Sequence, residues 1–386
     1  MRILMVTESF HPIVGGSETA IRYLSERMTA AGHTVMVAVM NVQNASSPSQ
    51  AFAFRVLSSR IGPFDCKTPG KIWNCRKIVR EFRPDVVNAH FLFESGFVGT
   101  SAAHSFGIPS VVSIRGRGIF FKPGNLLEKI LSRWWIRGAL KADAFLATSQ
   151  EMADIAQNRH GIAVTALGNG VDTVAFHPSK KKDIRSPLGI RPDQKVIFCA
   201  RRLVPKNGIE YMVRALPRIR KSEDAVLLLA AKREAEYDHL KAIAEELAVS
   251  SFIHFLGPLN HQDLPFFYAS ADVVVQPSIA EARSLACLEA MASGAVIVAT
   301  DTGGLAELLT HEKTGVLIPA FEESTYGVSA VKEGGVQSLA DGVLRALTET
   351  ALRERVSRGA REAAEGQSWD VIAGKTVDIF SSVLSS

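Results

Sequence analysis

The sequence predicts an α/β protein with two doubly wound domains, each a parallel sheet covered by helices on both faces. Three observations support this prediction. The chain has 386 residues, which is too long for one compact core. Short apolar runs of strand length alternate with longer amphipathic stretches. The alternation then begins again after a polar segment near the middle of the chain.

In the first half, strands are expected where β-branched and apolar residues cluster. The stretches from Ser17 to Ala30, closed by Gly32, and from Leu126 to Leu140 have the period of amphipathic helices. Because helices separate the strands, the strands are expected to pair in parallel. The predicted strands lie in 2–8, 34–39, 85–90, 110–115, 144–149 and 164–169.

A polar, basic segment at 177–194 is interpreted as the linker between the two domains. The same alternation follows it, and residues 320–337 read as a long polar loop before the last helices. The predicted strands of the second half lie in 195–201, 225–231, 251–257, 271–278, 295–300 and 314–319.

Composition excludes several classes of protein. With 47% hydrophobic and 22% charged residues, the chain is neither disordered nor fibrous. No apolar run reaches the roughly 18 residues of a membrane-spanning helix, and the N-terminal MRILMVTESF becomes polar too early for a signal peptide. A cytoplasmic location is therefore expected. The four cysteines, Cys66, Cys75, Cys199 and Cys287, have no C-x-x-C spacing, so neither a disulfide framework nor a zinc site is predicted.

The positive charge is concentrated in the first half. Residues 1–180 contain 20 Lys and Arg against 12 Asp and Glu, a net charge of +8. The remaining residues contain 24 against 27, a net charge of −3. This asymmetry indicates an anionic substrate or an anionic membrane surface for the first domain.

The turn at 8–20 follows the first predicted strand and contains Gly15, Gly16 and Ser17. Glycines allow close approach of the backbone to a ligand, and Ser17 can cap the following helix, so a phosphate fits this turn. The alternative is that the glycines only make a tight turn. No G-x-G-x-x-G or G-x-x-x-x-G-K-[ST] motif is present.

The stretch 273–309 gives the most specific indication of function. After the strand, a short loop carries Glu281, and Ser284 is a natural N-cap for a helix that contains Glu289 and ends before Gly294. The N–H groups of such a helix can bind phosphate, and the carboxylates can accept hydrogen bonds from sugar hydroxyls. This combination suits a nucleotide sugar. The alternative is that Glu281 is a solvated loop acid and Glu289 a helix-surface acid.

The glutamates seven residues apart, followed by A-M-A-S-G and T-G-G-x-x-E, resemble the donor site of retaining glycosyltransferases of the GT-B fold. The family is the large family 4, or glycosyl transferases group 1, which includes phosphatidylinositol mannosyltransferases and sucrose synthases. The resemblance covers nearly the whole chain. Its other parts are Gly15-Gly16-Ser17-Glu18, Asn169-Gly170-Val171-Asp172 with Phe176 and Pro178, Arg202-Leu203-Val204-Pro205, and Gly257 before the helix leading to Ala271-Asp272.

The resemblance implies two Rossmann-like domains facing a cleft. Residues 1–180 would bind the acceptor, residues 181–368 would bind the nucleotide-sugar donor, and 369–386 would form a C-terminal helix returning to the first domain. The implied reaction moves a sugar from a nucleotide-diphosphate sugar to a glycan or lipid-linked acceptor, with retention of the anomeric configuration.

The resemblance also assigns the donor residues. Glu281 would contact the donor sugar, Glu289 would hold the ribose hydroxyls, and Arg202 would bind the diphosphate. The lysine that usually precedes the glycine is replaced by Asn207, so Lys206 is assigned its role, and Glu281, Arg202 and Lys206 are the predicted catalytic residues. The other predicted donor contacts are Gly15, Gly16, Ala282, Arg283, Ser284 and Leu285.

Two departures leave the substrates open. Ala282-Arg283-Ser284 stands where family members often have a glycine and an aromatic residue, and Arg283 either contacts the donor or faces solvent. His90 and Arg115, at the ends of predicted strands, are assigned to acceptor binding. Many relatives have a histidine where Arg115 stands, and an arginine suits a phosphate or carboxylate on the acceptor or donor. The alternative for His90 is a packed core histidine.

No metal or cofactor is expected. The chain has no Asp-x-Asp motif, and Arg202, Lys206, the Gly16 N–H and the helix beginning near Ser284 could stabilise the charge on the leaving diphosphate.

Residues 115–141 combine seven basic side chains with four aromatic rings and one acid, Glu128. This pattern is typical of contact with an anionic membrane surface. An ordinary helix with packed tryptophans is an equal alternative, whereas nucleic-acid binding is disfavoured because no recognised module is present. The residues are Arg115, Arg117, Phe120, Phe121, Lys122, Lys129, Arg133, Trp134, Trp135, Arg137 and Lys141.

Three other functions remain open. A sugar-nucleotide epimerase would share the fold and donor site but need no acceptor. A dinucleotide-dependent oxidoreductase would explain the paired sheets, but the missing glycine fingerprint counts against it. A non-catalytic nucleotide-sugar binding protein is the third.

Overall fold

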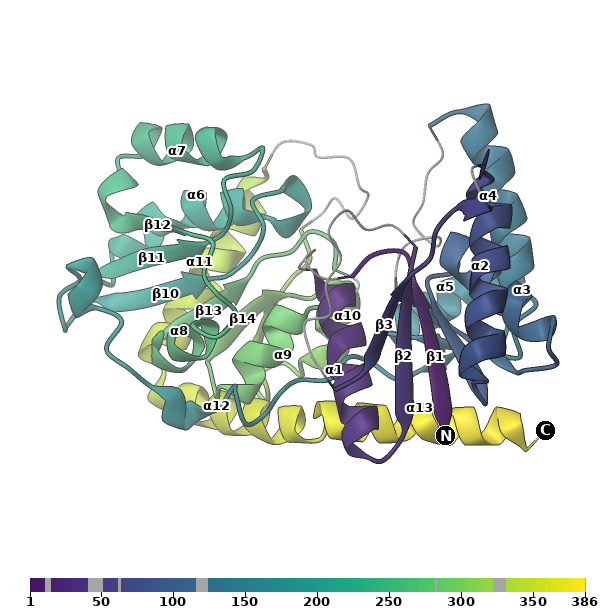
Figure 1. The fold of residues 1–386 in the computed structure, drawn as a ribbon. Helices are drawn as coiled ribbons and strands as arrows, with labels where there is room; N and C mark the ends of the chain where they lie inside the picture. The colour runs from purple at the N-terminus through teal and green to yellow at the C-terminus, as the bar shows by residue number, and fades with distance from the viewer. Residues whose placement is uncertain are drawn as a thin grey trace. The chain divides into compact units, whose positions relative to one another are not determined.

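A computed structural model describes residues 1–10, 15–40, 51–61, 64–115, 124–281, 283–321 and 331–385 of the chain. The contacts divide it into two compact units (Figure 1). Unit 1 comprises Met1–Gly170 together with Trp369–Ser386, and unit 2 comprises Val171–Ser368.

Unit 1 is built on a parallel sheet with the strand order β3-β2-β1-β6-β7-β8-β9. Its central strands are buried on both faces, which explains why their sequences are nearly continuous apolar runs. The strands are β1 (Arg2–Thr7), β2 (Thr34–Val39), β3 (Ala53–Val56), β6 (Val86–His90), β7 (Ser110–Ile114), β8 (Ala144–Ala147) and β9 (Thr165–Ala166), and β4 (Arg60–Ile61) and β5 (Phe64–Asp65) form a separate small hairpin.

The helices of unit 1 lie on either side of this sheet (Figure 1). On one side α13 packs against α1, where the rings of Tyr23 and Trp369 stack with their centroids 5.4 Å apart. On the other side α3 packs between α2 and α4. The bounds are α1 (Gly16–Ala30), α2 (Lys67–Phe82), α3 (Glu94–His104), α4 (Leu126–Ala139), α5 (Gln150–His160) and α13 (Trp369–Leu384).

Unit 2 repeats this architecture with the parallel order β12-β11-β10-β13-β14-β15. The strands are β10 (Lys195–Cys199), β11 (Ala225–Ala230), β12 (Ile253–Gly257), β13 (Val273–Gln276), β14 (Ile297–Thr300) and β15 (Val316–Ile318). The helices are α6 (Ile209–Arg220), α7 (Tyr237–Glu246), α8 (Leu264–Ser270), α9 (Leu285–Ala292), α10 (Gly303–Leu308), α11 (Glu333–Thr348) and α12 (Thr350–Glu365), with short 3-10 turns η1 (Pro178–Lys180), η2 (Ser186–Leu188), η3 (Pro205–Asn207) and η4 (Ser250–Phe252).

Alternation along β10 gives unit 2 two cores. Ile197 and Cys199 belong to the cluster formed with α6, α7 and α11, whereas Val196 and Phe198 belong to the cluster formed with α8, α9 and α10. Successive side chains of a strand point to opposite faces, so one apolar run supplies both clusters. The predicted fold class, two parallel doubly wound sheets covered by helices, is confirmed.

The interpretation of 177–194 as a linker is wrong, because this segment is packed into unit 2. Ile184 and Ile190 are buried in its core. Arg185 donates to the main-chain oxygen of Gln194 at 3.3 Å and pairs with Asp272 at 2.6 Å. Its lysines and serines made the segment look like a free connection, but its apolar residues anchor it.

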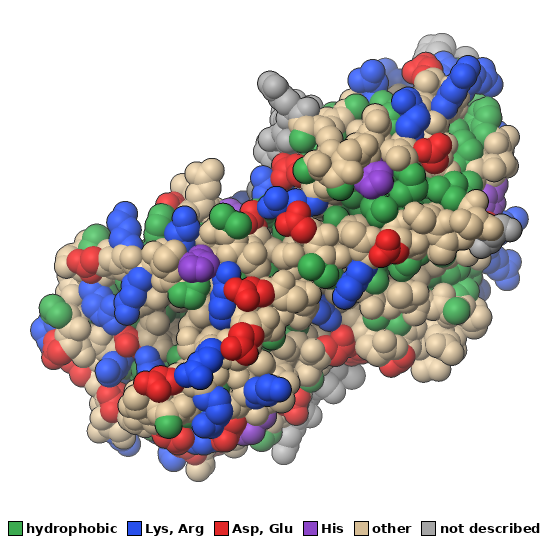
Figure 2. Space-filling model, turned by 90° about the horizontal axis from the view of Figure 1, so that it is seen from below, with side chains coloured by type: hydrophobic (Ala, Val, Ile, Leu, Met, Phe, Trp, Pro, Cys, Tyr) green, Lys and Arg blue, Asp and Glu red, His purple; other side chains and the backbone are tan. Residues whose placement is uncertain are grey.

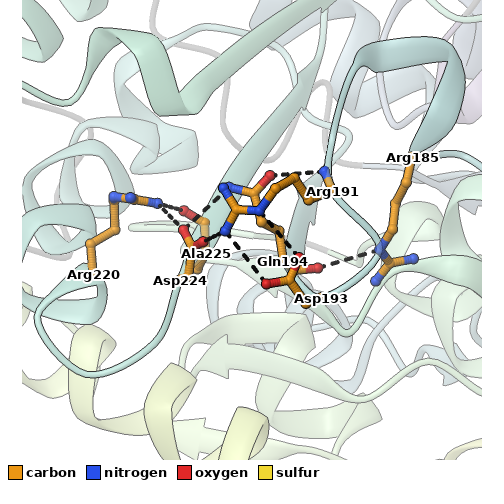
Figure 3. A network of polar contacts seen from close by, with 7 residues as sticks. All are labelled: Arg185, Arg191, Asp193, Gln194, Arg220, Asp224 and Ala225. Carbon is orange, nitrogen blue, oxygen red and sulfur yellow. Dashed lines mark hydrogen bonds and ion pairs between the residues drawn. The ribbon is translucent and has the colours of Figure 1, made fainter.

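Figure 3 shows the polar part of this anchor at the amino ends of β10 and β11. Asp224 accepts from Gln194 at 3.2 Å and from Arg220 at 3.0 Å, and it pairs with Arg191. The unit division at Gly170 likewise falls earlier than the expected boundary at residue 180, since Val171 and Phe176 are buried in the core of unit 2.

In each sheet the strand order reverses beside the first strand, between β1 and β6 in unit 1 and between β10 and β13 in unit 2. In open parallel sheets, ligands bind at the carboxyl ends of the strands at such a reversal, because the loops there diverge to opposite faces. Ligand-binding residues are therefore expected after β10 and β13 in unit 2, and after β1 and β6 in unit 1.

Candidate functional site

Two loops meet at the carboxyl ends of β10 and β13 in unit 2. The loop after β10 contains η3, and the main-chain oxygen of Lys206 accepts hydrogen bonds from the N–H groups of Ile279 at 2.8 Å and Ala280 at 3.3 Å. Gly208 has φ +65°, and a Cβ on it would lie 1.9 Å from the main-chain oxygen of Pro277. Only glycine permits this close approach, so residue 208 fixes the spacing of the two loops.

A buried ion pair joins these loops. The guanidinium of Arg201 pairs with the carboxylate of Glu281, and their side chains are only 9% and 12% exposed. Arg201 also donates to Asn207 Oδ1, Ser278 Oγ and Ser284 Oγ, each at 2.9 Å. One arginine thus holds the loop after β10, the loop after β13 and the start of α9 together.

The ion pair keeps Glu281 charged. Burial would raise the pKa of this carboxyl group, but the charge and hydrogen bond of Arg201, aided by the charge of Lys206, hold its pKa below the usual value. Glu281 is therefore an ionised hydrogen-bond acceptor at neutral pH. The alternative of a solvated loop acid is wrong for this residue.

Helix α9 begins next to the pair, as the sequence predicts. Ser284 is the N-cap, and its hydroxyl accepts a hydrogen bond from the N–H of Cys287 at 3.1 Å. Leu285 is the first residue of α9. Ala282 lies outside the described residues.

Glu289 lies on α9, and its side chain is 11% exposed. It accepts a hydrogen bond of 2.7 Å from Nε2 of His261, whose ring packs against Phe176 with the centroids 5.3 Å apart. The alternative of a helix-surface acid is therefore wrong. His261 precedes α8, and nothing in the sequence pattern singled it out.

The two other predicted cations of this site differ in position. Arg202 has a 72% exposed side chain, and its Nε donates to Glu234 at 3.0 Å. Lys206 is exposed, and its charge lowers the pKa of Glu281. The structure thus brings Lys206 into electrostatic reach of Glu281. It places Arg201, which sequence reasoning missed, against the carboxylate of Glu281.

Arg283 does not face solvent. Its side chain is 11% exposed, pairs with Glu307 at 3.5 Å and donates to Gln367 at 2.5 Å. Burial lowers its pKa, although the charge of Glu307 opposes this effect. Arg283 therefore anchors the loop before α9 to the end of unit 2.

In unit 1 the predicted acceptor residues lie side by side. His90 ends β6 and is fully buried, and Arg115, which follows β7, donates from Nε to His90 Nδ1 at 3.2 Å and from Nη1 to Asn169 Oδ1 at 3.3 Å. Gly15 and Gly16 lie at the start of α1, where Gly15 is the extended N-cap. Glu18, in the first turn of α1, accepts from Ser9 Oγ.

Helix α4 carries an exposed apolar face. Leu126, Leu127, Ile130 and Trp134 are 72%, 66%, 56% and 44% exposed. On the opposite side Trp135 packs against Phe93 with ring centroids 4.9 Å apart and donates to Thr68 Oγ1 at 3.2 Å. Trp134 is therefore largely exposed, whereas Trp135 is partly buried. Residues 116–123, including Arg117, Phe120, Phe121 and Lys122, lie outside the described residues.

Two features of the described residues bear on the class of protein. No group of three or more His, Cys, Asp or Glu side chains among them is arranged to hold a metal ion. None of their helices combines the length and the apolar composition that crossing a membrane requires.

Comparison with known families decides what the two units are. The model of the glycosyl transferases group 1 matches residues 180–363, and the model of glycosyltransferase family 4 matches residues 14–175. The chain belongs to the family 4 glycosyltransferases.

Similar proteins agree with this assignment. An uncharacterized glycosyltransferase of Methanocaldococcus jannaschii is 28% identical, over 82% of this chain and 85% of its own. The alpha-monoglucosyldiacylglycerol synthase of Streptococcus pneumoniae is 23% identical, over 82% and 75%. The structure of Anabaena HepE in complex with UDP superposes with a TM-score of 0.79 at 21% identity, covering 99% of this chain and all of that one.

A family 4 glycosyltransferase uses a nucleotide-sugar donor, and the protein is accordingly an enzyme of the hexosyltransferase class with the GT-B fold. The loops around Arg201, Glu281 and Glu289 lie in the unit matched by the group 1 model.

Proposed function

We propose that this glycosyltransferase moves a hexose from a nucleoside-diphosphate sugar to a glycan or lipid-linked acceptor with retention of the anomeric configuration. The observation that carries the proposal is the carboxylate of Glu281, which Arg201 holds ionised beside the N-terminus of α9. A fixed anion can accept hydrogen bonds from sugar hydroxyls, while helix N–H groups and nearby cations bind phosphate.

Each donor residue has a distinct role in this proposal. Glu281 accepts hydrogen bonds from the sugar, and Glu289 accepts from the ribose hydroxyls after displacing His261 or while still bonded to it. Lys206 and Arg202 bind the diphosphate. The side chain of Arg202 is exposed and needs only to break its ion pair with Glu234 to reach the phosphates. Ser284 and Leu285, at the N-terminus of α9, add further donor contacts within unit 2.

Charge stabilisation is the main catalytic effect in this proposal. As the bond between the anomeric carbon and the phosphate oxygen breaks, negative charge grows on the diphosphate. Arg202, Lys206 and the first N–H groups of α9 would meet that charge, so a metal ion is not required. The acceptor oxygen bonds to the same face of the anomeric carbon, and its proton passes to the departing phosphate.

The exposed face of α4 supports a second part of the proposal, contact with an anionic membrane surface. Lys129, Arg133 and Arg137 are exposed and flank the apolar residues on the same side of the helix. Exposed apolar groups gain by burial at the headgroup boundary, and each nearby cation adds about 1 kcal/mol on anionic lipid. One similar protein is named for a glucolipid product, which supports a lipid-linked acceptor.

The experiment for the donor is a thermal-shift screen against UDP-, GDP- and ADP-sugars, since a ligand that binds the folded state raises the melting temperature. Stabilisation by one nucleotide series and transfer to an added acceptor support the proposal. Interconversion of the donor sugar without any acceptor would identify an epimerase instead. Binding of a donor without transfer to glycan or lipid-linked acceptors would contradict the proposed acceptor class.

A further inference from the structure

Arg115 is a partly buried cation whose hydrogen-bond partners in unit 1 are neutral. They are Nδ1 of His90 and Oδ1 of Asn169, at 3.2 and 3.3 Å. No carboxylate of the described residues lies within ion-pair distance of it. Placing a charge out of water without a counter-ion is costly, so this arrangement is unusual for a residue that only supports the fold.

The charge of Glu18 does not replace a direct counter-ion for Arg115. Glu18 raises the pKa of Arg115 through its charge, but burial is the larger effect and lowers that pKa to about 10. Glu18 already accepts from Ser9. Glu18 therefore compensates only part of the cost of burying the guanidinium of Arg115.

Several hydrogen-bond donors around Arg115 are unused. An arginine has five N–H donors, and His90 and Asn169 each take one, so Nη2 and part of Nη1 remain. His90 accepts at Nδ1, which leaves Nε2 as its N–H, and this buried atom has no partner among the described residues. Arg115 also lines a small pocket together with Ser113 and Thr148.

We propose that Arg115 determines substrate specificity by binding an anionic group, a carboxylate or a phosphate other than the diphosphate of the donor, on one of the two substrates of the transferase. His90 is a positioning residue, because its ring fixes Nε of Arg115 and leaves Nη2 and part of Nη1 for the ligand. A guanidinium matches both anions by paired hydrogen bonds, and the donors left unpaired by a neutral substrate disfavour that substrate. The assignment of the anion to a transferase substrate rests on the proposed function.

The first experiment measures anion binding without a donor. The unmodified enzyme is titrated with inorganic phosphate, glucose 6-phosphate and glucuronate, with glucose and chloride as neutral and simple-anion references, by thermal shift. Binding of phosphate or carboxylate compounds should weaken at least about 10-fold in Arg115→Gln. Arg76→Gln, which removes an exposed arginine of α2 in the same unit, should bind as the unmodified enzyme does.

A second variant covers the case in which Arg115→Gln does not fold. Asn169→Asp keeps the shape of the side chain and places an internal carboxylate against Nη1 of Arg115. That carboxylate should compete with the ligand, so anion binding should again fall at least about 10-fold although Arg115 is present. Unchanged anion binding in either folded variant would overturn the proposal, as would equal stabilisation of the unmodified enzyme by chloride and phosphate.

Two turnover assays then identify which substrate carries the anion. The donor assay compares the glucose and glucuronate forms of the nucleotide sugar that binds. The acceptor assay compares glucose with glucose 6-phosphate at constant donor. A preference of about 10-fold or more for the anionic member in one assay, lost in Arg115→Gln, supports the proposal, and the absence of a preference in both contradicts it. Binding of the free nucleoside diphosphate, measured separately, tests the proposed function and should not change in Arg115→Gln.

Discussion

Arg201 and Glu281 form a buried ion pair that joins the loops after β10 and β13. Both side chains are about nine-tenths buried, and Arg201 also reaches Asn207, Ser278 and the N-cap Ser284. The role of Arg201 in the proposed function is to position Glu281 and α9, since its Nη groups are occupied by protein acceptors.

The first prediction concerns the charge of Glu281. In Arg201→Gln the carboxyl group loses the cation that lowers its pKa, so its pKa should rise and the acidic limb of the activity profile should move to higher pH. The rate should fall about 100-fold or more. The measurement is kcat and KM across pH with a fixed donor.

Arg201→Lys and Arg218→Gln are the controls for this prediction. The lysine keeps the charge but not the planar fork, so it should restore the acidic limb more fully than the rate. Arg218 is half exposed and pairs with Asp341 on the surface. Its loss should change neither the rate nor the acidic limb of the activity profile. A purely structural role for Arg201 would lower the rate without moving the acidic limb, and this result would contradict the account.

The second prediction concerns Glu289 and the nucleotide. Glu289→Gln removes the charge that would strengthen hydrogen bonds to the ribose, so nucleotide affinity should weaken by about 1.5–3 kcal/mol while the fold is kept. Isothermal titration with the free nucleoside diphosphate measures the change. Equal affinity in the variant would show that Glu289 only anchors His261.

The third prediction separates the two exposed cations of the site. Arg202→Ala and Lys206→Ala should each reduce the rate about 100-fold, because each removes positive charge from the site where the diphosphate develops charge. Glu234→Gln, which frees Arg202 from its surface partner, should cost little. An unchanged rate in Arg202→Ala would show that Arg202 only pairs with Glu234 and does not bind the diphosphate. Lys206 and the N-terminus of α9 would then bind the phosphates.

The fourth prediction tests the membrane contact of α4. Vesicles rich in anionic lipid should bind the protein at low salt, whereas neutral vesicles should not. Replacing Lys129, Arg133 and Arg137 with Gln should release it. A control variant with Arg218, Lys221 and Lys241 replaced, all exposed in unit 2, should still bind. Figure 2 shows basic and acidic side chains interspersed on the face in view. The control variant loses the same net charge as the α4 variant, so it tests whether net charge alone explains the binding.

Retention of vesicle binding by the α4 variant would exclude this helix as the contact. No binding of the unmodified protein to anionic vesicles would instead favour a soluble acceptor. Trp134, 44% exposed, gives a further readout, because its fluorescence should shift on contact with lipid only if α4 is the surface used.

Local patterns predicted most of the fold. The apolar runs that became β1, β2, β10 and β11 were recognised because parallel strands are buried on both faces. The short strand β3 was missed because none of its four residues is buried and Arg55 interrupts the apolar ones, so no continuous apolar run marks the strand. The linker was misread because the isolated Ile184 and Ile190 carry no periodic signal.

The site was predicted less completely than the fold. Ser284 was predicted because serine is a common N-cap, and Glu281 because it lies in the loop before the helix. Glu289 was predicted because an unpaired acid within an apolar helix would be costly. Arg201 could not be separated from Arg202, because which of two adjacent arginines turns inward depends on the acceptors at Asn207, Ser278 and Ser284, brought together only by folding. His261 was missed for the same reason.

Slow hydrolysis of the donor can reveal the stereochemistry of the reaction, because water replaces the unknown acceptor. Proton NMR of the sugar first released from an α-linked nucleotide sugar reports the stereochemistry before the anomers equilibrate. Reaction with retention should release the α anomer first, and Glu281→Gln should abolish the signal, whatever acceptor the enzyme uses. Retention is the expectation under test. First release of the β anomer would contradict it.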